Sequence, residues 1–100
     1  HTTNRKNHKS MNYKPLIEAQ YKSMCDKQIA KNEDYGNSAF EDIEVMGRQI
    51  PAIDACLSRM SDKLKRLQSK DLMVDETLDD TLIDLVGYIV IYSILKNKEQ

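Results

Sequence analysis

Apolar residues recur at helical spacing along most of the chain, and four segments are expected to be helices. They cover residues 15–31, 39–49, 51–70 and 75–96. Pro15 and Pro51 suit a first helical turn, and Gly36 can adopt the positive φ that often follows a helix end. Glycine and proline are scarce, with three and two residues, and no stretch sustains the alternation typical of strands. The pattern predicts an all-α, four-helix, bundle-like domain.

The beginning of the chain differs from the rest in composition. Residues 1–10 are polar, with Arg5, Lys6 and Lys9 and no acid, and residues 1–12 are expected to be a flexible basic tail or a tag remnant. A basic arm that touches nucleic acid is the alternative. Residues 13–100 are expected to form a single helical domain.

The last expected helix is apolar on nearly every side from residue 85 to residue 95. A helix that is apolar all round needs cover all round, and three short helices provide too little of it. We therefore expect a homo-oligomer in which part of this segment is buried. The run is too short and too interrupted to span a membrane.

Three carboxylates lead into this apolar run. Glu76, Asp80 and Asp84 are four residues apart, so a helix places them on one face, where they repel one another. Asp84 lies among apolar residues, where an unpaired charge is costly. Either a divalent cation or basic side chains from another helix must compensate it.

Basic residues follow one edge of the preceding expected helix, at Arg59, Lys63, Arg66 and Lys70. One interpretation is salt-bridging between these two helices. The other is a nucleotide polyphosphate site, in which carboxylates hold Mg²⁺ and the basic side chains bind phosphate oxygens. The pattern alone leaves both open.

Two smaller clusters allow the same two kinds of interpretation. In Asp34-Tyr35-Gly36, the acid could end a helix and the tyrosine could be half buried; alternatively Tyr35, or Phe40, stacks on a base and Gly36 lets the backbone approach the ligand. Glu41 and Glu44 share a face of the helix expected over residues 39–49, and could either be solvated or join a metal site.

Other chemistry is largely excluded. Cys25 and Cys56 are the only cysteines, do not form a close pair, and are expected to be core residues of a reduced, intracellular protein. No histidine lies in the expected domain, and there is no glycine-rich phosphate loop. The formal net charge of -1 gives no strong field for nucleic acid or a membrane surface, so neither partner is expected.

Three motifs follow one another at a fairly specific spacing: Lys31-Asn32-x-Asp34-Tyr35-Gly36, Arg59-x-x-x-Lys63-x-x-Arg66-Leu67 and Asp75-Glu76-x-x-x-Asp80-Thr81-x-x-Asp84-Leu85-x-x-Tyr88. In this order they resemble the nucleotide modification associated domain 1 family of bacteriophages and bacteria. The resemblance implies a role in nucleotide or base modification. More remotely, the chain is similar to the all-α nucleoside triphosphate pyrophosphatases of the MazG and dimeric dUTPase type, which hold Mg²⁺ with Glu-x-x-Glu and Glu-x-x-Asp motifs. This chain departs from the second motif, with acids four residues apart.

Together these observations predict a nucleotide-binding protein of the bacterial or phage-infected cytoplasm, with its cleft between the helices 51–70 and 75–96. An enzyme of this kind would be a Mg²⁺-dependent pyrophosphohydrolase that cleaves a nucleoside triphosphate between the α and β phosphates. The alternative is a non-catalytic phage interaction protein that sequesters a nucleotide or binds a host protein. The expected catalytic and metal-binding residues are Glu76, Asp80 and Asp84, joined at the metal by Glu41 and Glu44. The expected nucleotide-binding residues are Asp34, Tyr35, Gly36, Arg59, Lys63 and Arg66.

Overall fold

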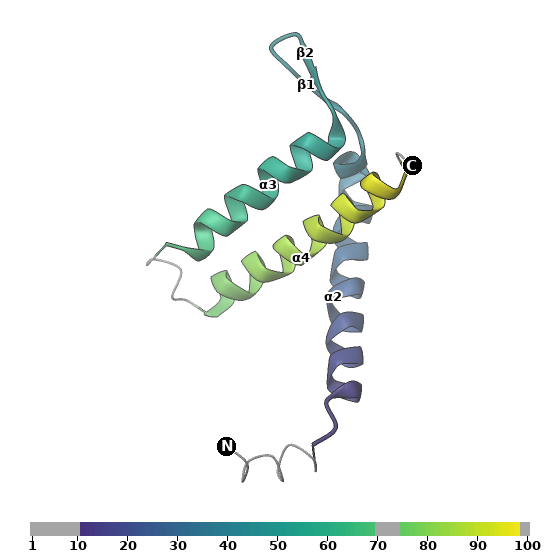
Figure 1. The fold of residues 1–100 in the computed structure, drawn as a ribbon, viewed down its shortest axis with the longest axis vertical. Coiled ribbons are helices and arrows are strands. Elements are labelled where there is room, and N and C mark those ends of the chain that lie inside the picture. The colour runs from purple at the N-terminus through teal and green to yellow at the C-terminus, as the bar shows by residue number, and fades with distance from the viewer. Residues whose placement is uncertain (1–10, 70–74, 99–100) are drawn as a thin grey trace.

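The computed structural model describes residues 11–69 and 75–98, and in the last helix it describes side chains from Leu78 onward. The described elements are the helix α2 (Lys14–Tyr35), the short 3-10 helix η1 (Ser38–Phe40), the strands β1 (Ile43–Val45) and β2 (Arg48–Ile50), and the helices α3 (Ala52–Leu67) and α4 (Asp75–Lys98) (Figure 1). The prediction of a mainly α-helical chain is therefore confirmed. Three long helices and a hairpin stand where four helices were expected.

The prediction of a helix over residues 39–49 is wrong, because this segment forms η1 and an antiparallel hairpin. Val45 pairs with Arg48, so only Met46 and Gly47 form the turn, and their φ values are 51° and 81°. Two successive positive φ values define the two-residue turn whose twist matches that of a hairpin. The β-branched residues at the strand positions favour this structure over a helix.

The hairpin also positions the start of α3. The backbone N–H of Ala52 donates to Asp42 Oδ1 at 2.8 Å. A carboxylate at this place satisfies a backbone donor that the helix leaves free and interacts favourably with the helix dipole. Asp42, which the sequence placed in a helix of its own, therefore acts at the N-terminus of α3.

The helix α2 continues one turn beyond its expected end at residue 31. It ends at Tyr35, and Gly36 adopts a φ of 62° while its N–H donates to the carbonyl of Asn32. The positive φ predicted for Gly36 is confirmed. The added turn places Lys31, Asn32 and Tyr35 in one continuous helix.

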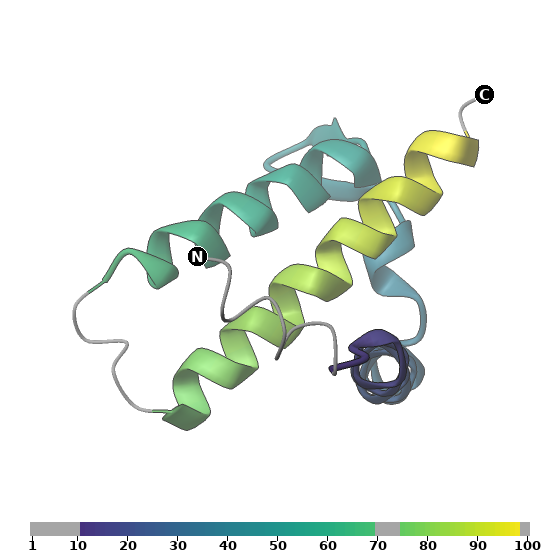
Figure 2. The ribbon, with the colours of Figure 1, turned by 60° about the horizontal axis from the view of Figure 1, so that its bottom comes forward.

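The core lies between α3 and α4, which run antiparallel beside each other (Figures 1 and 2). Cys56 is 1% exposed and packs with Ile91 and Leu95. Its thiol donates to the carbonyl of Tyr88 at 3.2 Å, and burial raises the pKa of that thiol. Cys56 is thus the core residue that the sequence predicted, whereas the same prediction for Cys25 is wrong because Cys25 is exposed.

The helix α2 crosses α4, and its N-terminal end extends beyond this crossing (Figures 1 and 2). None of its residues is buried. The radius of gyration is 17.6 Å, whereas a compact domain of 100 residues has about 13 Å. Considerable apolar surface is left open as a result, on α2 and on the segment 85–95 of α4. Across the described ranges, no helix is long and apolar enough to cross a bilayer.

The turn of the hairpin provides a stability prediction. Met46→Asn is expected to raise the free energy of unfolding by about 1 kcal/mol, because asparagine tolerates a left-handed φ that disfavours methionine. Little packing is lost, since Met46 is 97% exposed. Urea unfolding measures the change, and Gly47→Ala is the matched control, expected to destabilise because its φ of 81° suits glycine. An unchanged or lower midpoint for Met46→Asn contradicts the assigned turn.

Candidate functional site

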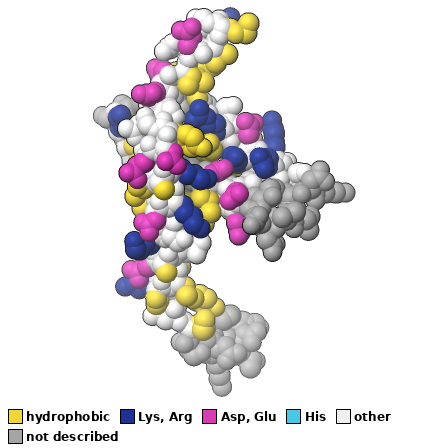
Figure 3. Space-filling model, turned by 180° about the vertical axis from the view of Figure 1, so that it is seen from behind, with side chains coloured by type: hydrophobic (Ala, Val, Ile, Leu, Met, Phe, Trp, Pro, Cys, Tyr) yellow, Lys and Arg dark blue, Asp and Glu magenta, His cyan; other side chains and the backbone are white. Residues whose placement is uncertain are grey.

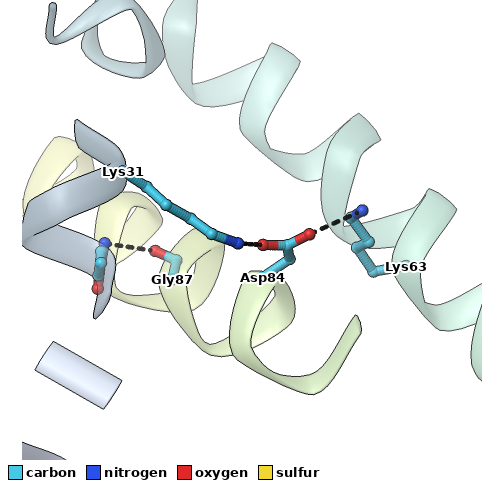
Figure 4. A network of polar contacts seen from close by, with 5 residues as sticks. Lys31, Lys63, Asp84 and Gly87 are labelled. Carbon is cyan, nitrogen blue, oxygen red and sulfur yellow. Dashed lines mark hydrogen bonds and ion pairs between the residues drawn. The ribbon is translucent and has the colours of Figure 1, made fainter. Parts of the chain in front are cut away.

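Asp84 lies on α4 between the other two long helices, and both of its carboxylate oxygens are occupied (Figure 4). Lys31 of α2 donates to Oδ1, and Lys63 of α3 donates to Oδ2 at 3.1 Å. The Asp84 side chain is 24% exposed. The charge that the sequence marked as needing compensation is thus paired with lysines. The pairing with Lys63 matches the salt-bridge interpretation, and the pairing with Lys31 was not foreseen.

The electrostatics of this network follow from its geometry. Burial opposes the ionisation of Asp84, but the hydrogen bonds from Lys31 and Lys63 outweigh it and lower the pKa of the carboxyl group. The hydrogen bond with Asp84 raises the pKa of Lys31. Asp84 and Lys31 are therefore both charged at neutral pH, and the network with Lys63 joins all three long helices.

A second contact holds α2 against α4 beside this network. The Gln28 amide Nε2 donates to the carbonyl of Gly87 at 3.1 Å (Figure 4). Gly87 is buried, and a Cβ built on it would lie 3.6 Å from Gln28 Cδ, an ordinary contact distance. These two contacts lie about one turn apart along α2 and hold the C-terminal half of this helix against α4.

A pocket of about 400 Å³ opens at this junction. Its size is that of a small-molecule site. Its walls come from α2, η1, α3 and α4, and their polar side chains include both signs of charge and two tyrosines. These polar lining residues are Gln28, Lys31, Asn32, Tyr35, Ser38, Arg59, Asp84 and Tyr88.

Arg59 differs from the other cations of the site. It lies half-buried in the pocket wall, and no described residue forms an ion pair or a hydrogen bond with its side chain. Lys31 and Lys63, in contrast, both contact Asp84. Basic side chains gather near the middle of the molecule, with acidic ones among them (Figure 3). Arg59 is therefore the cation best placed to receive an anionic ligand.

The structure brings only some of the predicted nucleotide-binding residues together. Tyr35 and Arg59 line the pocket, and Lys63 supports it through Asp84. Asp34 and Arg66 are exposed and do not line the pocket. Gly36 ends α2 and also lies outside the lining. Phe40, the alternative stacking residue, packs against the core instead.

The predicted acidic residues are dispersed. Glu41 follows η1 in an extended conformation and Glu44 lies on β1, so the shared helical face proposed for them is wrong. Asp80 is exposed, and the side chain of Glu76 lies outside the described residues. Within residues 11–69 and the described side chains of α4, no three His, Cys, Asp or Glu residues form a group that could hold a metal ion.

Several lining residues were missed as site residues, among them Gln28, Lys31, Asn32 and Tyr88. Lys31, Asn32 and Tyr88 belong to the motifs that carry the family resemblance, which is one signal that could have identified them. The other signal is helical spacing: with α2 extended to Tyr35, positions 28, 31, 32 and 35 lie on one face.

Comparisons with known proteins give no assignment. No protein-family model, no curated protein and no solved structure matches this chain. The resemblance noted from the motifs stays a prediction, and the function is argued from the pocket itself.

Proposed function

We propose that the pocket between α2, α3 and α4 binds a nucleotide. The observation that carries this proposal is Arg59: this residue lies half-buried in the pocket wall, and its side chain has no acidic partner among the described residues. A buried or half-buried cation without a partner is costly, and an anionic ligand offsets that cost. The phosphates lie at Arg59 in this arrangement.

The remaining lining groups suit the rest of a nucleotide. A guanidinium can bind phosphate oxygens through two parallel hydrogen bonds. Tyr35, which is 71% exposed, offers a ring face for a base, and Tyr88 lines the pocket while it packs against the core. Asn32 and Ser38 supply polar groups beside them. The ligand class is therefore one that combines phosphate with an aromatic ring.

Asp84 acts in this proposal as a positioning residue. It holds Lys31 at the pocket and ties it to Lys63. Binding of Mg²⁺ by Asp84 stays a prediction, and it requires the carboxylate to exchange at least one lysine for the metal. Cleavage between the α and β phosphates depends on that exchange, so we derive no hydrolytic step from the arrangement described.

A second function, from a different class, is supported by the open apolar surface. Ile89, Val90 and Ile94 of α4 are 48%, 40% and 41% exposed. Surface of this kind favours an association of chains, and we propose that the protein is a homo-oligomer. A non-catalytic protein that binds a host partner uses the same type of surface.

A thermal-shift panel tests the nucleotide proposal. Nucleoside triphosphates and monophosphates at 100 times their Kd are expected to raise the melting temperature by about 10 °C or more, because such a ligand stabilises the fold by about 2.7 kcal/mol. Nucleosides without phosphate are the control and are expected to have little effect. Each hit is repeated with and without Mg²⁺, and its products are analysed: intact ligand indicates binding alone, whereas monophosphate and pyrophosphate indicate the enzyme. No shift with any nucleotide contradicts the proposal.

A further inference from the structure

The pocket between α2, α3 and α4 carries a small surplus of positive charge. Lys31, Lys63 and Arg59 bring three positive charges to one carboxylate, that of Asp84. The surplus is therefore two positive charges. Asp80, one turn before Asp84 on α4, is exposed and also attracts Lys31, so it reduces this surplus rather than adding to it.

Two side chains of the pocket can donate hydrogen bonds to an anion. Arg59 has five N–H donors in a planar fork, and no described residue pairs with its side chain. Such a fork matches two oxygens of one phosphate group. Lys31 donates one N–H to Asp84, and an ammonium group has three. The pocket therefore offers one guanidinium from α3 and one ammonium from α2.

The charge of a phosphate monoester matches this surplus. It is about −1.5 to −2 at pH 7, because the second pKa of the phosphate is about 6. A triphosphate carries further phosphate charges, which proteins usually balance with Mg²⁺ held by one or two carboxylates. Among the described residues, Asp84 supplies the only carboxylate of the pocket lining, and lysines occupy both of its oxygens. The described charges therefore suit one phosphate group better than three.

We propose that the preferred ligand of this pocket is a nucleoside monophosphate, bound as its dianion and without a divalent cation. This inference rests on the proposed nucleotide function and names the form of nucleotide that the site selects. Arg59 and Lys31 bind the phosphate, and Tyr35 offers its ring to the base. Asp84 stays with its lysines. The volume of about 400 Å³ agrees, because it lies near the lower end of the range of small-molecule sites, about 300–1,000 Å³.

A series of ligands built on one nucleoside tests the charge requirement. Titration calorimetry at pH 7 with EDTA compares the monophosphate, the cyclic monophosphate, the triphosphate and the nucleoside without phosphate. The monophosphate is expected to bind roughly tenfold or more tightly than the cyclic ester, which has a single charge and one terminal oxygen fewer. The triphosphate is expected to bind more weakly than the monophosphate. Mg²⁺ in place of EDTA is expected to add no affinity to the monophosphate.

The pH dependence separates the charge of the ligand from that of the protein. Arg59 is always charged, the pKa of Lys31 is raised and the pKa of Asp84 is lowered, so all three keep their charges between about pH 7 and pH 5. The phosphate monoester takes up its second proton in this range. The affinity for the monophosphate is therefore expected to fall toward pH 5, whereas the affinity for the cyclic ester stays level.

Matched lysine variants test the role of the ammonium. Lys31→Met is expected to weaken monophosphate binding and to reduce its advantage over the cyclic ester, a ratio that a general loss of packing does not change. Lys27→Met is the control, because Lys27 is exposed, lies one turn earlier on α2 and is outside the pocket lining. It is expected to leave the ratio of the two Kd values unchanged. Circular dichroism verifies folding, and the wild-type ligand series decides if Lys31→Met fails to fold.

The outcomes distinguish this inference from the proposed function. If no nucleotide binds, nucleotide binding itself is contradicted, and this inference fails with it. A triphosphate that binds more tightly than the monophosphate, with or without Mg²⁺, overturns this inference alone and leaves nucleotide binding standing. Equal affinities for the monophosphate and the cyclic ester, unchanged between pH 7 and pH 5, also overturn it.

Discussion

Arg59→Met is expected to weaken nucleotide binding by roughly 10- to 100-fold. Hydrogen bonds to charged groups contribute about 1.5–3 kcal/mol, and about 1.4 kcal/mol corresponds to a factor of ten. The fold should tolerate the change, because no described residue pairs with the guanidinium and methionine keeps an apolar stem of similar length. Titration calorimetry of folded protein with the best ligand of the thermal-shift panel measures the loss.

Arg66→Met is the matched control for this prediction. Arg66 lies seven residues further along the same edge of α3, is exposed, and is outside the pocket. Arg66→Met removes the same charge from the chain as Arg59→Met does. It is expected to change the Kd by less than about threefold, because the charge at this surface position is screened. Arg59→Lys should recover only part of the affinity, because the planar pair of donors is lost. Equal losses for Arg59→Met and Arg66→Met would mean that binding depends on general charge rather than on this pocket.

Asp84→Asn is expected to lower the free energy of unfolding at pH 7 by about 1–2 kcal/mol. The network lies between two known cases: exposed ion pairs contribute about 0–1 kcal/mol, and breaking a buried pair costs about 3–5 kcal/mol. Asp84 is 24% exposed and Lys63 20%, whereas Lys31 is 48% exposed and accordingly better solvated. The amide leaves both lysines without their common acceptor. Nucleotide binding should weaken as well, because Lys31 is no longer held at the pocket.

The pH dependence of that difference provides an independent check. The folded pKa of Asp84 is below its ordinary value, so the stabilisation is present above the unfolded pKa of about 3.9 and is lost as pH falls through the folded pKa. The pKa of Lys31 is raised, so its contribution is lost only as pH rises through that higher value, above about 10.4. The wild-type protein should therefore exceed Asp84→Asn in stability at pH 7, and the difference should shrink below about pH 4.

Urea unfolding at pH 7, 4 and 3 measures this difference, and Asp80→Asn is the control. Asp80 lies one turn before Asp84 on α4, is exposed, and forms no ion pair with a described residue. Its replacement is expected to change the free energy of unfolding by less than about 0.5 kcal/mol. A deficit for Asp84→Asn that stays constant between pH 7 and pH 3 would contradict the charged network.

The sequence alone predicted the long helices and the need to compensate the charge of Asp84. Apolar spacing and end signals act within a few residues, so α3 and α4 could be predicted to within a few residues of their ends. The hairpin could not be predicted in the same way, because its strands are three residues long and its turn has methionine where asparagine is usual. The expected helix over residues 39–49 rested on acids near its start, but Asp42 caps α3 instead.

The site was harder to predict because its residues come from separate elements. Lys31 and Asp84 are 53 positions apart in the chain, and only the crossing of α2 over α4 brings them together. The sequence identified Asp84 and a basic helix edge. Which contact each basic residue makes depends on packing: Lys63 faces Asp84, Arg59 faces the pocket, and Arg66 faces solvent. The sequence analysis ended α2 at residue 31, one turn too early. It therefore did not show that positions 28, 31, 32 and 35 share one helical face.

Residue-resolved NMR during titration with a nucleoside triphosphate tests the central claim most directly. The account predicts that the largest shifts occur at the pocket, in Lys31, Asn32, Tyr35, Arg59 and Tyr88, and that they saturate together with one Kd. Ile17 and Ile29 on the same helix α2 should move little, since neither lines the pocket. Shifts confined to other surfaces, or no saturable shifts at the pocket residues, would contradict nucleotide binding at this site.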